Sequence, residues 1–113
     1  MKIEILWFSD CPNYQNAAEL LREILREENI AAAVEMVPVV DDADARAQKF
    51  LGSPTIRLNG VDPFALPAQT HYALQCRVYF TPDGLRGMPT KEMIRDAVRG
   101  SKKTFEVSET SKV

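Results

Sequence analysis

MKIEILWFSDCPNYQNAAELLREILREEN, residues 1–29, predicts a strand that runs directly into a helix, with a cysteine at the junction. Residues 2–8 are β-branched and aromatic, and almost continuously apolar after Glu4, which is typical of a strand covered on both faces. Residues 13–26 place apolar side chains on one helical face and charged ones on the other. Pro12 suits the first helical position, because its missing N–H would have no partner there.

Cys11 stands at the amino end of this helix. Free backbone N–H groups and the helix dipole favour negative charge there, so the pKa of the Cys11 thiol is expected to fall below that of a free thiol. Asp10 opposes this effect, since a neighbouring carboxylate disfavours a second anion. The alternative is a small, buried and inert cysteine. The strand–Cys-Pro–helix context favours the reactive thiol.

Composition predicts one domain, residues 1–100, followed by a polar, flexible C-terminal tail, residues 101–113. Lys and Arg number 14 and Asp and Glu number 16, a net charge of −2, and no basic stripe indicates a nucleic-acid partner. No apolar run approaches the roughly 20 residues of a membrane helix. The N-terminus lacks the features of a secretory signal. We therefore expect a cytoplasmic protein, in which thiols are held reduced.

No metal site is expected from the residue spacing. The single His and the two Cys lie far apart in the chain, which gives no zinc-ligand spacing. The acidic cluster at residues 41–44 has the arrangement of a helix cap and first turn rather than that of a calcium loop.

The remaining elements follow from local patterns. They are a strand within 31–40, a short helix from Asp41 to Leu51, a strand at 55–58, a long loop at 61–74, a strand at 75–80 and a helix from 89 or 90 through Arg99, with Gly100 as its stop. The order is β-α-β-α-β-β-α. We expect the first two strands to be parallel and the last two to pair antiparallel. One four-stranded mixed sheet with helices on both faces would pack these elements.

The helix-opening Cys11, the Ser-Pro-Thr at residues 53–55 and the element order resemble the thioredoxin-like superfamily in its short, glutaredoxin-like form. In that family the X-Pro bond before the third strand is cis and lies against the reactive cysteine, and Ser53-Pro54 matches it. The Cys-Pro-Asn-Tyr at residues 11–14 resembles the site of small thioredoxin-like (seleno)proteins with a single active-site cysteine. The resemblance implies an oxidoreductase with Cys11 as nucleophile and Pro12, Tyr14, Ser53, Pro54 and Thr55 as substrate-contacting residues.

Tyr14 stands where the family's second cysteine would be, so Cys11 is expected to act by a one-cysteine route. That route passes through a mixed disulfide or a sulfenic acid, released by another thiol. Cys76 is the candidate resolving thiol. An antiparallel fourth strand would place it well over about 10 Å from Cys11, whereas a disulfide needs Cα atoms within about 7 Å. We therefore expect Cys76 to pack in the core or at an edge.

The sequence thus predicts a thiol oxidoreductase acting on a protein or small-molecule thiol or disulfide. No cofactor is implied, although glutathione is a candidate co-substrate. Two other classes stay open: a soft-metal or cluster-binding module through Cys11, and a redox-inactive thioredoxin-fold scaffold. Substrate, reductant, oligomeric state and the role of the 61–74 loop do not follow from the residues.

Overall fold

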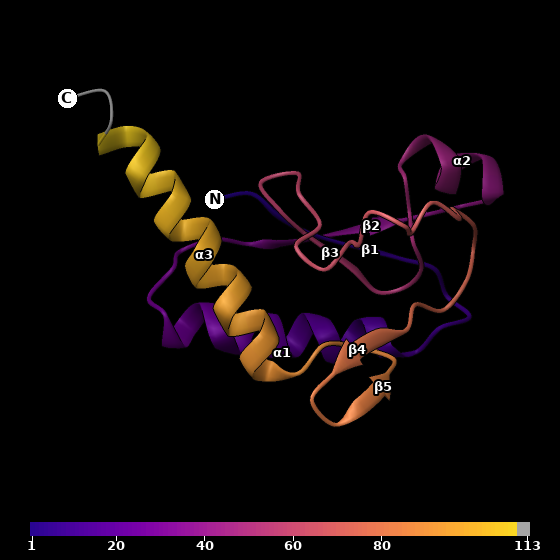
Figure 1. Ribbon diagram of the computed structural model, residues 1–113, viewed down its shortest axis with the longest axis horizontal. Coiled ribbons are helices and arrows are strands. Elements are labelled where there is room, and N and C mark those ends of the chain that lie inside the picture. Colours follow the sequence, from indigo (N-terminus) through magenta and orange to yellow (C-terminus); the bar gives the residue numbers. More distant parts are fainter. Residues whose placement is uncertain (111–113) are drawn as a thin grey trace.

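The computed structural model describes the backbone of residues 1–110 and the side chains of residues 1–101 (Figure 1). It is a small α/β domain in which the predicted element order is found, with one additional short strand. The elements are β1 Ile3–Trp7, α1 Asn13–Glu27, β2 Val34–Pro38, α2 Asp42–Ala47, β3 Thr55–Leu58, β4 Tyr79–Thr81, β5 Gly84–Arg86 and α3 Lys91–Thr110.

Strand β1 is the centre of a three-stranded sheet with the order β2-β1-β3. Strand β2 pairs with β1 in parallel, as predicted, and β3 pairs with it antiparallel. Ile5 lies opposite Met36 on one side and Ile56 on the other. Pro38 ends β2 at an edge of the sheet, where a residue without an N–H disrupts no ladder.

The two faces of β1 bury different side chains, because successive residues of a strand point to opposite faces. Ile3 and Ile5 belong to a core shared with α1 and α3, whereas Leu6 packs with Val39, Ala45 and Phe50 around α2. Figure 1 shows α1 and α3 together on one side of the sheet and α2 apart from them. The prediction of helices on both faces is confirmed.

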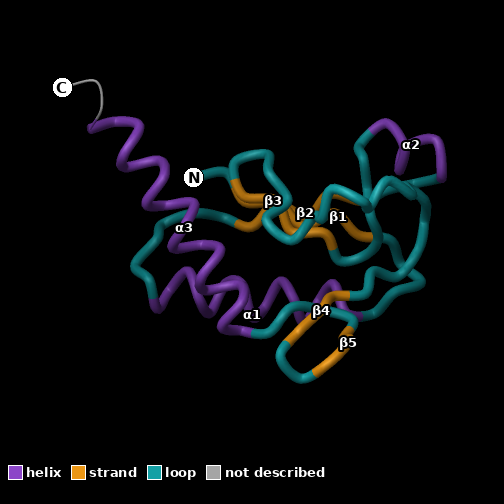
Figure 2. The backbone as a smooth tube through the Cα atoms, viewed as in Figure 1, coloured by secondary structure: helices purple, strands orange, loops and turns teal. Residues whose placement is uncertain are grey.

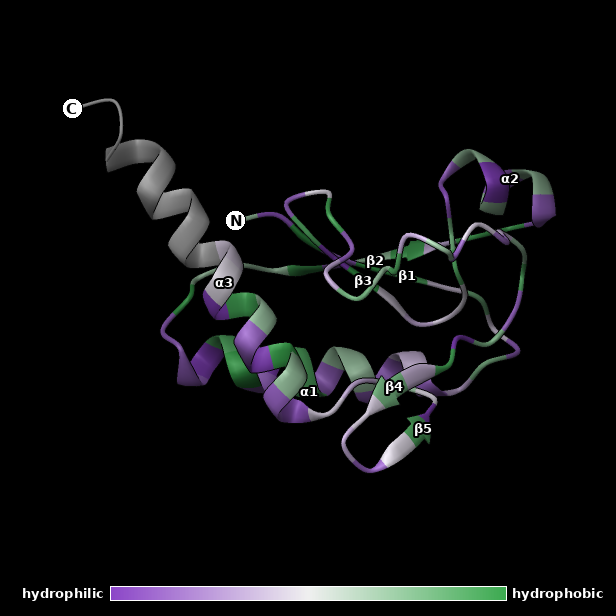
Figure 3. Cartoon of the chain, in the orientation of Figure 1, coloured by the Kyte–Doolittle hydropathy of each residue, from purple (hydrophilic) through white to green (hydrophobic). Residues whose placement is uncertain are grey.

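Helix α1 follows its amphipathic pattern, with Ala17, Leu21 and Ile24 buried. Figure 3 shows hydrophobic and hydrophilic residues alternating along it. The helix ends at Glu27, and Asn29 takes a left-handed φ of 57° just beyond the C-cap. Ile94 and Val98 of α3 are buried against the same core.

The acidic cluster at residues 41–44 is a helix cap, as predicted. The Asp41 side chain accepts a hydrogen bond of 2.7 Å from the backbone N–H of Asp44. The predicted end of this helix at Leu51 is wrong, because α2 stops at Ala47 and Lys49 adopts a left-handed φ of 54°.

The prediction of a single four-stranded sheet is also wrong. The fourth strand begins at Tyr79 rather than at residue 75, and it pairs with β5 in a separate hairpin (Figure 2). The turn of this hairpin joins Thr81 to Gly84. The preceding residues, 75–77, run alongside Ser53 in a parallel bridge, so the chain does not arrive in the antiparallel direction that pairing with β3 requires.

Helix α3 was expected to end at Arg99, but it continues through Gly100 to Thr110. Residues 111–113 of the predicted tail lie outside the described residues. We predict that residues 101–113 add little to the stability of the domain, because they lack an apolar pattern that could offset the entropy of ordering them. Among the described helices, none has the length and apolar character needed to cross a membrane.

Candidate functional site

Cys11 and Cys76 form a disulfide, with Cα atoms 5.7 Å apart and a sequence separation of 65. The expected separation of more than 10 Å is therefore wrong, as is the expectation that Cys76 only packs in the core or at an edge. The candidate resolving thiol lies within covalent reach of Cys11. The geometry brings together the two cysteines that the sequence analysis kept apart.

The strand register explains why both cysteines reach the same end of the sheet. Leu6, near the end of β1, pairs with Thr55 at the start of β3, so the chain that leads to Cys11 lies beside the chain that precedes Thr55. Cys76 forms an isolated parallel bridge with Ser53. The backbone N–H of Ser53 donates to the carbonyl of Gln75 at 2.8 Å, and the N–H of Arg77 donates to the carbonyl of Ser53 at 3.0 Å.

Gly52 permits this close approach of the two chains. A Cβ at that position would lie only 2.8 Å from the backbone nitrogen of Arg77, and the φ of Gly52 is 131°, a conformation that L side chains rarely adopt. Gly52 thus leaves room for the segment that carries Cys76 to pack directly against the backbone before Ser53.

The predicted Ser-Pro-Thr motif lies beside the disulfide. The Ser53–Pro54 bond is cis, as predicted. Ser53 is buried, and its hydroxyl has no hydrogen-bond partner within the described part of the chain. Thr55 is also buried and donates from Oγ1 to the carbonyl of Gly52 at 2.6 Å.

The other two predicted contact residues lie at the start of α1. Pro12 is the exposed N-cap and offers no side-chain acceptor to the first turn, which contains no acidic residue. Tyr14 stacks on Trp7 with ring centroids 4.4 Å apart. Both rings line a surface groove of about 410 Å³ together with Met36 and Arg22. Trp7 is therefore partly a surface residue, not only the core residue its strand pattern indicates.

The two cysteines of the disulfide differ in their exposure to solvent. Cys11 is only 1% exposed, whereas Cys76 is an exposed residue. Cys11 is also held by a backbone hydrogen bond of 3.3 Å from its N–H to the carbonyl of Phe8. The disulfide thus has one enclosed end and one end at the surface.

Next to Cys76 lies a buried charged cluster that the sequence analysis missed. The Arg77 side chain is 2% exposed and donates from Nη1 to Asp62 Oδ2 at 2.6 Å and from Nη2 to Oδ1 at 3.3 Å. Its Nη1 also lies 3.4 Å from Thr55 Oγ1. Arg77 is the residue after Cys76. It thus joins Asp62, at the start of the 62–77 segment, to Thr55 at the start of β3.

Tyr79 completes this cluster. The Arg77 guanidinium lies over its ring at 4.5 Å from the centroid, and the Tyr79 hydroxyl donates to the carbonyl of Pro54. Phe64 packs edge-on against the same ring. Burial raises the pKa of the Tyr79 hydroxyl well above its usual range, because the interior disfavours the phenolate.

A sequence signal for this cluster existed. Arg77 is the one cation among residues 75–80, which are otherwise mostly apolar. A charged residue in such a strand is seldom buried without a partner of opposite charge, so its position indicates an ion pair. Its partner Asp62 lies 15 residues earlier, at the start of the long loop. Nothing in the local pattern of either residue identifies the other.

No group of three or more His, Cys, Asp or Glu side chains suitable for a metal ion occurs among the described residues. No family model, no curated protein and no solved structure matches the chain.

Proposed function

We propose that the protein is a thiol–disulfide oxidoreductase of thioredoxin-like type, with Cys11 and Cys76 as its redox pair. The observation that carries this proposal is their disulfide at the start of α1, beside Ser53 and Pro54. Redox pairs in this class of enzyme must pass between dithiol and disulfide. Two cysteines brought together from positions 65 residues apart satisfy that requirement.

The chemistry is a two-electron exchange with an external disulfide. The two thiols of Cys11 and Cys76 are oxidised to one S–S bond, and the S–S bond of the substrate is reduced to two thiols, which take up the two protons released. An external dithiol, or two molecules of glutathione, then reduces the Cys11–Cys76 bond and restores the starting state. No metal or organic cofactor enters this cycle.

This proposal modifies the one-cysteine route expected from Tyr14. A mixed disulfide or a sulfenic acid on one cysteine would be resolved by the other within the same chain, since an intramolecular thiol has a large effective concentration. Pro12 and Tyr14, which reach the surface, keep their proposed part in substrate contact, whereas Ser53, Pro54 and Thr55 are buried and would support the disulfide from inside. The cytoplasm stays the proposed compartment if the disulfide is transient, as catalytic and redox-sensing disulfides of cytosolic proteins are, whereas a disulfide that persists indicates an oxidising compartment.

A redox-inactive scaffold is the second candidate, and the near-complete burial of Cys11 favours it. In that case the disulfide would only stabilise the fold. Structural disulfides resist reduction by glutathione because their reduction potentials lie below about −300 mV, and they belong to oxidising compartments. The reduction potential therefore separates the two candidates.

The test is an equilibrium titration of the protein in mixtures of reduced and oxidised glutathione, followed by steady-state reduction of a small aromatic disulfide. We expect a potential in the range of about −120 to −270 mV found for redox enzymes. Cys11→Ser and Cys76→Ser should each abolish turnover by the pair. A potential below about −300 mV with no turnover would establish the scaffold.

The metal-binding alternative has its own measurement. Protein purified under anaerobic conditions should show no charge-transfer absorbance and should contain two titratable thiols after reduction. An absorbing metal or cluster that is lost in Cys11→Ser and retained in Cys76→Ser would overturn the redox proposal.

A further inference from the structure

We infer that Cys76, and not Cys11, is the cysteine that exchanges with external thiols and disulfides, and that Cys11 resolves the mixed disulfide from inside. This inference rests on the proposed function and assigns the order of its steps. It reverses the order that the position of Cys11 in the sequence suggests.

Access is the first reason. Thiol–disulfide exchange requires an external thiolate to approach one sulfur of the bond, so the rate depends on which sulfur can be reached. Cys11 is 1% exposed, while Cys76 and its neighbour Val78 are exposed. The side of the bond that faces solvent is therefore the Cys76 side.

The leaving group is the second reason. When an external thiolate attacks Cys76, the sulfur that leaves is that of Cys11, which lies just before the first turn of α1. The N-cap Pro12 accepts no hydrogen bond from that turn, and no acidic side chain occupies it, so its N–H groups and the helix dipole favour a thiolate. Asp10, the neighbouring carboxylate that opposes this effect, is exposed, so solvent screens its charge. A stabilised thiolate leaves faster.

The backbone on each side of Cys76 supports the same assignment. Hydrogen bonds from Ser53 to Gln75 and from Arg77 to Ser53 hold the chain immediately before and after Cys76. The Arg77 side chain is fixed in the interior by Asp62. Cys76 is thus presented at the surface by a segment that is anchored on both sides.

The steps balance as follows. An external thiolate attacks Cys76 Sγ, the Cys11–Cys76 bond breaks, and its electron pair stays on Cys11 Sγ. A second external thiolate then attacks the external sulfur of the mixed disulfide and releases Cys76. In the oxidising direction, the Cys76 thiolate attacks the substrate disulfide and releases one substrate thiol. The Cys11 thiolate then attacks Cys76 Sγ and releases the other.

The experiment traps the mixed disulfide of the full-length wild-type chain. Oxidised protein is mixed with glutathione, quenched with excess maleimide and digested, and mass spectrometry locates the two labels. We expect glutathione on Cys76 and maleimide on Cys11, with a preference of roughly tenfold or more over the reverse pattern. The same protein unfolded in urea is the control, and it should lose the preference.

Glutathione found mainly on Cys11, or equally on both cysteines of the folded protein, would overturn the assignment. If the intermediate is too short-lived to trap, single-cysteine variants decide. Cys11→Ser, which retains Cys76, should react with an aromatic disulfide faster than Cys76→Ser, which retains Cys11. The reverse ranking refutes the inference. Both readouts locate the attacked sulfur even if the protein turns over no substrate, so failure of the proposed function is recognised separately.

Discussion

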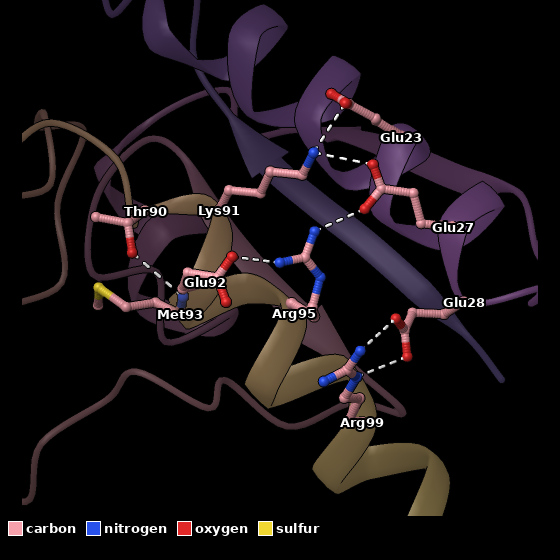
Figure 4. A network of polar contacts seen from close by, with 9 residues as sticks. All are labelled: Glu23, Glu27, Glu28, Thr90, Lys91, Glu92, Met93, Arg95 and Arg99. Atoms are coloured by element: carbon pink, nitrogen blue, oxygen red, sulfur yellow. Dashed lines mark hydrogen bonds and ion pairs between the residues drawn. The ribbon is translucent and has the colours of Figure 1, made fainter.

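Two groups of ion pairs in the described part of the chain have opposite surroundings. Arg77 and Asp62 form a two-pronged pair beside the disulfide, with side chains 2% and 12% exposed. The second group joins α1 to α3 across the surface (Figure 4), where Lys91 contacts Glu23 and Glu27, and Arg95 contacts Glu27 and Glu92. Arg99 and Glu28 add a second two-pronged pair.

The two groups of ion pairs differ in how far their side chains are exposed to solvent, not in the geometry of their contacts. Exposed ion pairs are screened by water and salt, and each holds long side chains that would otherwise be free to move, so little net stability results. A buried pair costs more to desolvate, but removing one partner leaves an uncompensated charge in the interior. The number of contacts is larger on the α1–α3 surface, yet the consequences of mutation should be larger at Arg77.

Arg77→Met should have the largest effect on stability. It leaves Asp62 without its partner in a largely buried position, and we expect a loss of about 3–5 kcal/mol in the free energy of unfolding, measured by urea denaturation of the oxidised protein. The double variant Arg77→Met/Asp62→Leu should be less destabilised than the single one, because no unpaired charge remains. A double variant at least as unstable as Arg77→Met would contradict this account.

Tyr79→Phe should cost about 1 kcal/mol, because the hydroxyl that donates to the carbonyl of Pro54 is lost while the ring stays. The cost should depend on pH. The pKa of Tyr79 is raised by burial, so the folded state keeps the hydroxyl proton above about pH 10, where an unfolded tyrosine loses it. The contribution of the Tyr79 hydroxyl to the free energy of unfolding is therefore fully present below that pH and declines as the pH rises further.

Urea midpoints at pH 8 and pH 11 measure this difference. The gap between wild type and Tyr79→Phe should be present at pH 8 and smaller at pH 11. A gap that is unchanged or wider at pH 11 would mean that folding does not raise the pKa of Tyr79.

Glu27→Gln should have the smallest effect, although Glu27 contacts two cations. Hydrogen bonds from Lys91 and then Arg95 lower the pKa of Glu27 below its usual value. Its contribution is thus present above the unfolded pKa of about 4.3 and is lost as pH falls through the lower folded value. The shift in melting temperature should be small at pH 7, and should disappear once the pH lies below the lowered pKa of Glu27, or in about 1 M salt, where the screening length is about 3 Å.

Arg99→Lys is the matched control for Arg77→Lys. Both changes keep the positive charge and remove a two-pronged contact, one at the surface and one in the interior. Only Arg77→Lys should lower the urea midpoint appreciably. Equal shifts would show that burial does not distinguish the two groups.

The sequence alone determined the parts of the fold that depend on near neighbours. The period of apolar residues predicted β1 and α1, and Asp41 predicted the cap of α2. The position of Cys11 at a helix start also follows from adjacent residues. Each of these features depends on side chains a few positions apart, whose geometry is that of the regular element itself.

Only the tertiary structure decided how the 61–78 segment returns to the sheet. Its direction beside Ser53 is set by hydrogen bonds to Gln75 and Arg77 and by the Arg77–Asp62 pair, none of which has a local signature. The wrong direction gave the wrong distance for Cys76. The pairing of Cys11 with Cys76 and the exposure of the two cysteines were decided by the tertiary structure as well, because both depend on contacts between residues far apart in the chain, which no local period records.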